Sequence, residues 1–272
     1  MQPLSLSQLS GRLILALSDE EFMMTEKYEE GRKFLKSNWE TIEGTWQSDQ
    51  AKGVSAPEQE EAPLPGTTII PLIKEDKLSI QGAPLLDLLR SRKSRRKYAA
   101  QPFTLEEFSF LCWAAAGIRE HRAKFSFRTA PSGGARHPFD LFIYVDRVES
   151  IPPGLYRYLP VEHALALVRS GDDSSVLNEA LRDQYWKAAA VFIWAAVPYR
   201  TEWRYGPVSH KIIALDAGHA CQNLYLACEA LGAGTCAIGA YDQNRLDAYL
   251  GLDGTDRFAL YVATTGKQTG VS

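Results

Sequence analysis

The sequence predicts an α+β fold in which helices flank a central sheet as a three-layer sandwich. Ala189–Val197 is apolar at every position, which is typical of a central strand buried on both faces. Phe139–Val145 is a second, largely apolar run and is also predicted to be a buried strand. A long helix is predicted over Ser209–Leu231, because its apolar residues recur at steps of three and four: Ile213, Ala217, Ala220, Leu224, Ala227, Cys228 and Leu231.

Shorter segments complete the predicted layers. Thr104–Glu107 forms a capping box, in which the Thr hydroxyl and the Glu carboxylate satisfy free amides at a helix start. That helix is expected to run to Ala116 and to end at Gly117 in a left-handed conformation. The remaining predicted elements are a helix over Pro84–Arg92, hairpin strands over Leu155–Leu159 and Ala164–Val168, and a strand over Phe258–Ala263.

Two zones of the chain differ in composition. Residues 1–66 are predicted to be an N-terminal extension or wrapping arm with a linker, and residues 67–272 a packed domain. The polar, proline-bearing run at 47–66 cannot bury enough apolar area to pack alone. The first 21 residues carry only Arg12 before a short apolar patch, so we expect no signal peptide.

Composition excludes several classes of function. With 272 residues and 45% apolar content, the chain can build a full core. A net charge of −3 argues against a nucleic-acid partner, and the even mixing of charges argues against a membrane-surface partner. No apolar run is long enough to span a membrane. Four cysteines without a CxxC pair predict reduced core thiols in a cytoplasmic protein and no metal site: Cys112, Cys221, Cys228 and Cys236.

The first segment that carries chemistry is Arg90–Tyr98, which has six cations in nine residues. Two interpretations stand. The run is a solvated surface stretch, or it is an anion site at a helix end. Arginine presents paired donors to a phosphate, and Ser94 adds a hydroxyl. A dianionic phosphate would relieve part of the repulsion among the cations.

Two glycine-bearing segments follow. In Ala130–Pro138, adjacent glycines before a strand let the backbone approach a flat ligand, although a plain tight loop is the alternative. The lack of G-x-S-x-G argues against Ser132 as a hydrolytic nucleophile. Leu231–Tyr241 superficially suggests a dinucleotide fingerprint, but a helix precedes its glycines and a strand follows, which is the reverse of that motif. Small residues at Gly239 and Ala240 would expose backbone N–H groups to a ligand.

These segments, in this order, resemble the nitroreductase-like FMN superfamily, and within it the azoline oxidases and SagB-type dehydrogenases. The resemblance spans roughly Leu85 to Lys267, and more weakly Gly31–Pro57. Its strongest part is Arg92–Tyr98, which fits the family's Arg-basic-Ser-x-Arg-x-aromatic phosphate motif at every position. The opening Ala-Pro-Ser of the loop at 130–132 and the stretch at 216–224 of the long helix fit as well.

The resemblance implies a mainly antiparallel central sheet and a homodimer with FMN at its interface. It implies that Arg92, Lys93, Ser94 and Arg96 hold the FMN phosphate, with Lys267 as a further cation. The family offers backbone amides to the flavin N5 edge at the positions of Gly239 and Ala240. It also implies a loop that contacts the flavin across the dimer interface, matched here by Pro131, Ser132, Gly133, Ala135 and Arg136.

One departure concerns catalysis. Azoline oxidases resemble this chain at Arg204-Tyr205 but place a Lys before the Tyr, and that pair is associated with proton removal from the azoline ring. Arginine is a poor general base because it stays protonated, which argues against azoline oxidation, although Tyr205 could still donate or accept a proton. His210, Asp216 and His219 share the long helix, but their spacing does not place three metal ligands on one face.

The functional prediction is an FMN-dependent oxidoreductase that works by a ping-pong mechanism. The donor is NADH, NADPH or an organic substrate, and the substrate is a small molecule or a peptide. The alternative is a flavin-retaining scaffold subunit of a peptide-modifying complex, with residues 1–66 as its docking arm.

Overall fold

A computed structural model of the chain describes residues 27–122 and 125–270. The chain divides into two compact units at Glu43/Gly44. Within its described part, the smaller unit contains the helix α2 (Glu29–Leu35) and the 3-10 helix η2 (Trp39–Thr41). Residues 44–66 belong to the larger unit. The boundary at 66/67, which rests on composition, stays a prediction.

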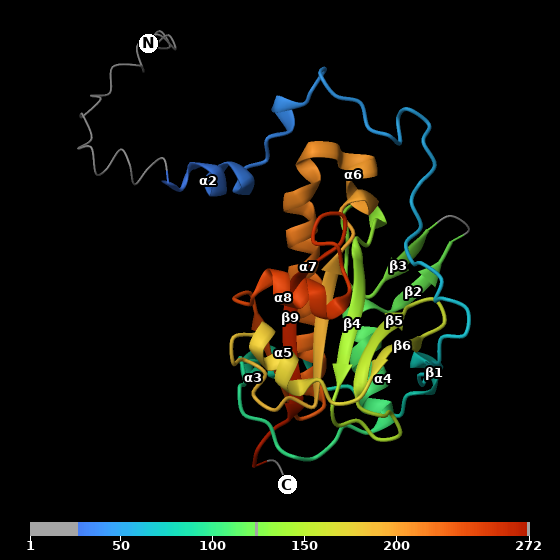
Figure 1. Cartoon of the computed structure of the whole chain (residues 1–272), viewed down its shortest axis with the longest axis vertical. Helices are drawn as coiled ribbons and strands as arrows, with labels where there is room; N and C mark the ends of the chain where they lie inside the picture. Colours follow the sequence, from blue (N-terminus) through green and yellow to red (C-terminus); the bar gives the residue numbers. More distant parts are fainter. Residues whose placement is uncertain (1–26, 123–124, 271–272) are drawn as a thin grey trace, which may run out of the picture. The chain divides into compact units, whose positions relative to one another are not determined.

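The larger unit alternates helices with strands (Figure 1). Its helices are α3 (Leu85–Ser91), α4 (Leu105–Ala116), α5 (Ser174–Ala180), α6 (Tyr199–Tyr205), α7 (Ser209–Ala230) and α8 (Gln243–Leu250). Its strands are β1 (Ile69–Pro71), β2 (Ile118–His121), β3 (Ser126–Arg128), β4 (Phe139–Val145), β5 (Gly154–Leu159), β6 (Ala164–Ser170), β7 (Ala190–Ala196), β8 (Ala233–Ile238) and β9 (Phe258–Lys267). Short 3-10 turns are η3 (Glu75–Lys77), η4 (Gly133–Ala135) and η5 (Gly206–Val208).

Seven strands form the central sheet in the order β1-β6-β5-β4-β7-β9-β8, and every neighbouring pair is antiparallel. The strand β7 lies between β4 and β9, so the prediction of a central strand at this run is confirmed. The predicted hairpin is confirmed as the antiparallel pair β5–β6. A separate two-stranded ribbon, β2–β3, lies outside this sheet.

Side chains alternate between the two faces of the sheet and build two cores. On β7, Phe192 and Trp194 pack into the core that contains α4 and α7, whereas Val191 and Ile193 pack into the core that contains α5 and α8. All four side chains are completely buried. Because each face of the sheet is covered by helices, the predicted three-layer α+β class is confirmed (Figure 1).

The helix α4 begins as predicted but ends differently. Thr104 and Glu107 form the reciprocal capping box, with the Glu107 N–H 3.2 Å from Thr104 Oγ1. Gly117, however, is extended (φ −66°, ψ 156°), so the prediction of a left-handed stop is wrong. Glycine is needed there for space, because a Cβ would lie 2.3 Å from Trp113 Cδ1.

Candidate functional site

The cationic segment after α3 runs along the free edge of β8. Ser94 pairs with Thr235 as a parallel bridge, and the Arg95 N–H donates to the Thr235 carbonyl at 3.0 Å. Tyr98 anchors the far end of the segment through its hydroxyl, which lies 2.8 Å from Thr264 Oγ1. The segment is therefore an extended strand-like edge, with alternate side chains on opposite sides.

This alternation gives the cations different roles. Arg95 turns inward and forms an ion pair with the buried Glu229 at 3.0 Å. The guanidinium groups of Arg92 and Arg96 lie instead over aromatic rings, at 5.3 Å from the ring centre of Tyr225 and 5.5 Å from that of Trp186. In the described ranges, neither of these two arginines has a carboxylate partner. Arg95 is thus structural, whereas the charges of Arg92 and Arg96 are uncompensated.

Tyr225 on α7 connects this segment to the end of β8. Its hydroxyl lies 2.9 Å from Ser94 Oγ and accepts a hydrogen bond of the same length from the Ala237 N–H. Sequence reasoning did not predict this role for Tyr225. The spacing of Tyr225 along the helix does not predict this contact, because the contact depends on how β8 and the cationic segment pack against α7.

Gly239 and Ala240 follow β8 directly and are exposed. The β8–β9 pairing stops at Ile238, so the N–H groups of both residues lie beyond the ladder. Gly239 is four residues, or about 13 Å along an extended chain, from Thr235, where Ser94 is anchored. One exposed edge therefore carries uncompensated cations at one end and small residues at the other.

The loop at residues 130–138 is fixed from α7. Ser132 Oγ donates to the Asp216 carboxylate at 2.6 Å, and the Gly133 N–H donates to the same carboxylate at 3.2 Å. Burial raises the pKa of Asp216, although these two hydrogen bonds oppose the shift. Sequence analysis placed Asp216 in the stretch that resembles the family and weighed it as a metal ligand, but did not predict that it holds the loop. Within the described ranges, no group of three or more His, Cys, Asp or Glu side chains could hold a metal ion.

The two predicted catalytic residues adjoin this loop. Gly134 has a positive φ of 57°, and a Cβ at this position would lie 2.7 Å from the Tyr205 hydroxyl and 2.9 Å from Arg204 Cδ. Arg204 is exposed, with its guanidinium 5.5 Å from the centre of the Tyr205 ring. Arg204, Tyr205 and the loop therefore form one surface.

Two other predicted site residues have partners within the chain. Arg136 is buried, donates from Nε to the Arg200 carbonyl at 2.8 Å, and lies 4.7 Å from the Trp203 ring centre. The Lys267 ammonium contacts the Glu107 carboxylate. Their predicted contacts with a cofactor stay predictions.

The helix α7 separates the cationic segment from the loop. Asp216, which holds the loop, and Tyr225, which contacts Ser94, are nine positions apart on α7. At 1.5 Å per residue, this is about 14 Å along the helix axis. The predicted site residues therefore form two candidate surfaces at different levels of one helix.

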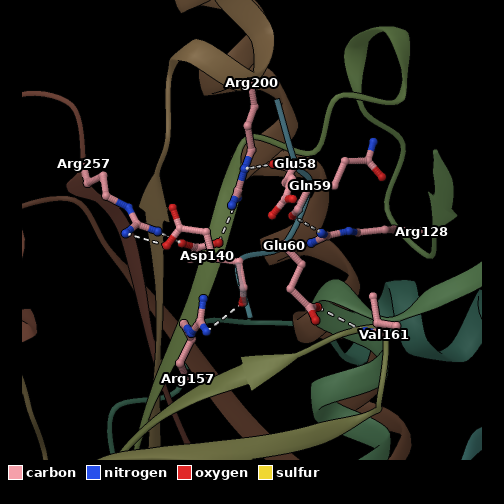
Figure 2. Close-up of polar contacts among 10 residues, drawn as sticks. Glu58, Gln59, Glu60, Arg128, Asp140, Arg157, Val161, Arg200 and Arg257 are labelled. Carbon is pink, nitrogen blue, oxygen red and sulfur yellow. Dashed lines mark hydrogen bonds and ion pairs between the residues drawn. The ribbon is translucent and has the colours of Figure 1, made fainter. Parts of the chain in front are cut away.

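A short strap at residues 57–61 packs against the sheet beside this loop, and arginines from distant parts of the chain hold it (Figure 2). Backbone carbonyls of the strap accept hydrogen bonds from Arg128, Arg136, Arg157 and Arg200. Asp140 on β4 neutralises part of this charge. Although burial alone would raise its pKa, the Arg200 and Arg257 charges hold the pKa of Asp140 below its usual value.

Gln59 connects the strap to the loop. Its Nε2 donates to the Ala135 carbonyl at 2.5 Å, and its Oε1 accepts from the Ser126 N–H at 3.0 Å. Ala135 has a positive φ of 53°, a conformation that costs energy for a residue with a Cβ. The strap thus helps to hold the loop in a strained conformation.

The comparisons with known proteins agree with this geometry. Residues 89–267 match the profile of the nitroreductase family. A protein of Methanocaldococcus jannaschii named as a nitroreductase is 34% identical over 169 residues, covering 61% of this chain and 84% of that protein. A trifolitoxin-processing protein of Rhizobium leguminosarum is 29% identical over 133 residues, covering 46% of this chain and 36% of that protein.

Solved structures show the same fold. A nitroreductase structure from Ralstonia eutropha has a TM-score of 0.63 and 27% identity, covering 80% of this chain and 94% of that one. A chain of the Escherichia coli microcin synthetase complex has a TM-score of 0.56 and 18% identity, with 98% of each chain covered. At that identity, the second match shows the fold alone.

The antiparallel sheet covered by helices gives the α+β class, and the match of residues 89–267 to the nitroreductase family gives the class of oxidoreductase. The chain belongs to the nitroreductase family. The family resemblance inferred from the sequence is thereby confirmed. Within the described part of the chain, no helix is long and apolar enough to cross a membrane.

We predict that the strap makes stability depend on pH through Glu60. Burial and the neighbouring Glu162 raise the pKa of Glu60 to about 7 from a usual value of 4.5. Between pH 4.5 and 7 the folded chain keeps a proton that the unfolded chain releases, so stability falls as the pH rises across this range. The free energy of unfolding should be lower at pH 8 than at pH 5 by about 2 kcal/mol from this group.

Urea unfolding of Glu60→Gln at both pH values measures this contribution, because the amide cannot titrate. The pH dependence should be weaker in Glu60→Gln than in the wild type. Glu58→Gln is the matched control: its side chain is exposed, and it should keep the wild-type pH dependence. An unchanged pH dependence in Glu60→Gln would contradict the assignment.

Proposed function

We propose that the chain is an FMN-dependent oxidoreductase that holds the FMN phosphate through Arg92, Ser94 and Arg96, with Lys93 beside them. The observation that carries this proposal is the pair of guanidinium groups without a carboxylate partner in the described ranges, fixed beside the Ser94 hydroxyl at the edge of β8. A phosphate fits this donor set, because it accepts paired hydrogen bonds from arginine and offsets two charges.

The residues after β8 fit the flavin ring. When bound, FMN takes a hydride from a donor and passes it to an acceptor in two half-reactions, which is ping-pong chemistry. Gly239 and Ala240 offer exposed backbone directly after β8, the strand whose edge also carries Ser94. Their N–H groups would stabilise negative charge on the ring, since the backbone is already positioned.

A homodimer explains why the site residues form two surfaces. The loop with Pro131, Ser132, Gly133, Ala135 and Arg136 would contact the flavin held by the partner subunit. The exposed apolar side chains of α3 support a subunit contact near the cationic segment: Leu85, Leu86 and Leu89 are 60%, 57% and 54% exposed.

The hydride donor proposed for the reductase role is NADH or NADPH, and the acceptor is a small molecule. We propose a cytoplasmic setting, which fits the four buried cysteine thiols. We keep Lys267 as a proposed further cation near the phosphate. Its ammonium contacts the Glu107 carboxylate, so it would act on the phosphate through its charge.

Loss of phosphate contacts should weaken FMN binding more than folding. Arg96→Ala and Ser94→Ala should each raise the Kd for FMN roughly 10- to 100-fold, equivalent to about 1.5–3 kcal/mol for a charge-assisted hydrogen bond. Equilibrium dialysis measures the Kd, and thermal unfolding without added FMN checks the fold.

Arg90→Ala is the matched control for this test. Arg90 belongs to the same basic run but is exposed and lies 3.6 Å from Asp87, so FMN affinity should stay at the wild-type value. Wild-type affinity in both Arg96→Ala and Ser94→Ala would refute the phosphate assignment.

A second candidate function is oxidation of a peptide-derived ring, as in a peptide-modifying complex. The similarity to the trifolitoxin-processing protein of Rhizobium leguminosarum favours it. In this role Tyr205 would transfer the proton, since arginine is a poor general base, and the Arg204 charge would stabilise the Tyr205 oxygen. The scaffold alternative requires a partner protein, so turnover by the purified full chain alone would contradict that alternative.

Removing the Tyr205 hydroxyl should distinguish the reductase role from the oxidation of a peptide-derived ring. Tyr205→Phe should lower kcat for a substrate whose oxidation releases a proton by about 100-fold or more, the usual scale of acid–base catalysis. Tyr199→Phe on the same helix is the control, because the Tyr199 hydroxyl donates a hydrogen bond to Asp49, which is not a predicted site residue. Steady-state kinetics of both variants decide the matter, and unchanged turnover in Tyr205→Phe would exclude the proton role.

A further inference from the structure

A pocket of about 740 Å³ lies beside the loop at residues 130–138, between α6 and the β2–β3 ribbon. Its lining has an unusual charge composition. Four arginines contribute to it, and none of its lining residues is acidic: the four are Arg119, Arg128, Arg136 and Arg204. A cavity of this size suits a ligand of ordinary small-molecule dimensions.

The two exposed arginines of the pocket are not neutralised. Neither Arg119 nor Arg204 forms an ion pair with a carboxylate in the part of the chain that the structure describes. The guanidinium of Arg204 lies over the Tyr205 ring instead. Two exposed cations that line the pocket are thus available to an incoming anion.

The two buried arginines that line the pocket add further positive charge to it. Arg128 and Arg136 donate to backbone carbonyls, those of Gln59 and Arg200 (Figure 2 shows the first). The Arg128 Nε–H is buried without a hydrogen-bond partner. Burial, and next the charge of Arg204, lowers the pKa of Arg136, so the positive charges in this region repel one another. An anion would relieve that repulsion.

Aromatic side chains form the apolar part of the wall. The rings of Phe125 and Phe127 meet edge to face, with centres 5.3 Å apart. Trp203 is held in place by a 2.9 Å hydrogen bond from Nε1 to the Val54 carbonyl. Fixed aromatic walls favour a flat ring in the pocket, since aromatic contacts add to simple burial.

We propose that this pocket binds a flat aromatic molecule that carries an anionic group, either a carboxylate or a phosphate. The ring packs among Phe125, Phe127 and Trp203, and the anion meets Arg119 and Arg204. Gly134 and Ala135 line the same pocket, so the ligand lies beside the loop that is proposed to contact the partner's flavin. As a substrate site, this inference rests on the proposed function, whereas the binding itself does not.

Isothermal titration calorimetry of the full chain with three matched probes tests the proposal: 2-naphthoate, 2-naphthyl phosphate and the neutral 2-naphthamide. At neutral pH and fixed ionic strength, at least one anion should bind about tenfold or more tightly than the amide. Comparison of the carboxylate with the phosphate identifies the anionic group. Equal binding of all three, or tighter binding of the amide, would overturn the proposal.

Variants locate the anion. Arg119→Gln and Arg204→Gln should each raise the Kd of the preferred anion about 5- to 10-fold and leave the Kd of the amide unchanged. Both side chains are exposed, so the fold should tolerate the changes. Arg245→Gln on α8 is the control, since Arg245 is also exposed and does not line the pocket. Anion binding unaffected by both pocket variants would place the anion elsewhere and contradict the proposal.

This readout also separates the two proposals. Binding heat does not require flavin or turnover. A chain that fails to retain FMN but still prefers the anion contradicts the cofactor assignment and supports the pocket. A chain that retains FMN but shows no preference contradicts the pocket alone.

Discussion

Repulsion among the cations after α3 is the constraint on which the candidate site depends. Five of the six residues in Arg92–Lys97 are cationic, and the backbone bridge from Ser94 to Thr235 fixes this segment along the edge of β8. One charge is neutralised internally, by the Arg95–Glu229 ion pair. The backbone bridge to Thr235 and the Tyr98 hydroxyl hold the rest in place. A structure that fixes like charges side by side is best explained by an anion that belongs there.

The helix α7 gives this site its geometry. Its buried face packs on the sheet, while Asp216 fixes the loop at one level and Tyr225 and Glu229 fix the cationic segment at another. The helix α7 therefore both packs against the core and positions the candidate site residues. Since the same helix holds both surfaces, a disturbance of its packing would affect both together.

Much of the fold could be predicted from local patterns. The runs of β4 and β7, the stripe on α7 and the capping box of α4 each depend on residues close in sequence. The strap could not be predicted in this way. Its composition is polar, and it is held by arginines from four other segments. These arginines lie far from the strap in the sequence and meet it only when the chain folds (Figure 2). The Lys267–Glu107 contact escaped prediction for the same reason.

The visible absorption spectrum of the purified chain, recorded after incubation with excess FMN and removal of unbound FMN, tests the central claim most directly. The account predicts a yellow protein that retains flavin in stoichiometric amount, because the cations at the edge of β8 hold its phosphate. A correctly folded chain that stays colourless after this treatment would contradict the account.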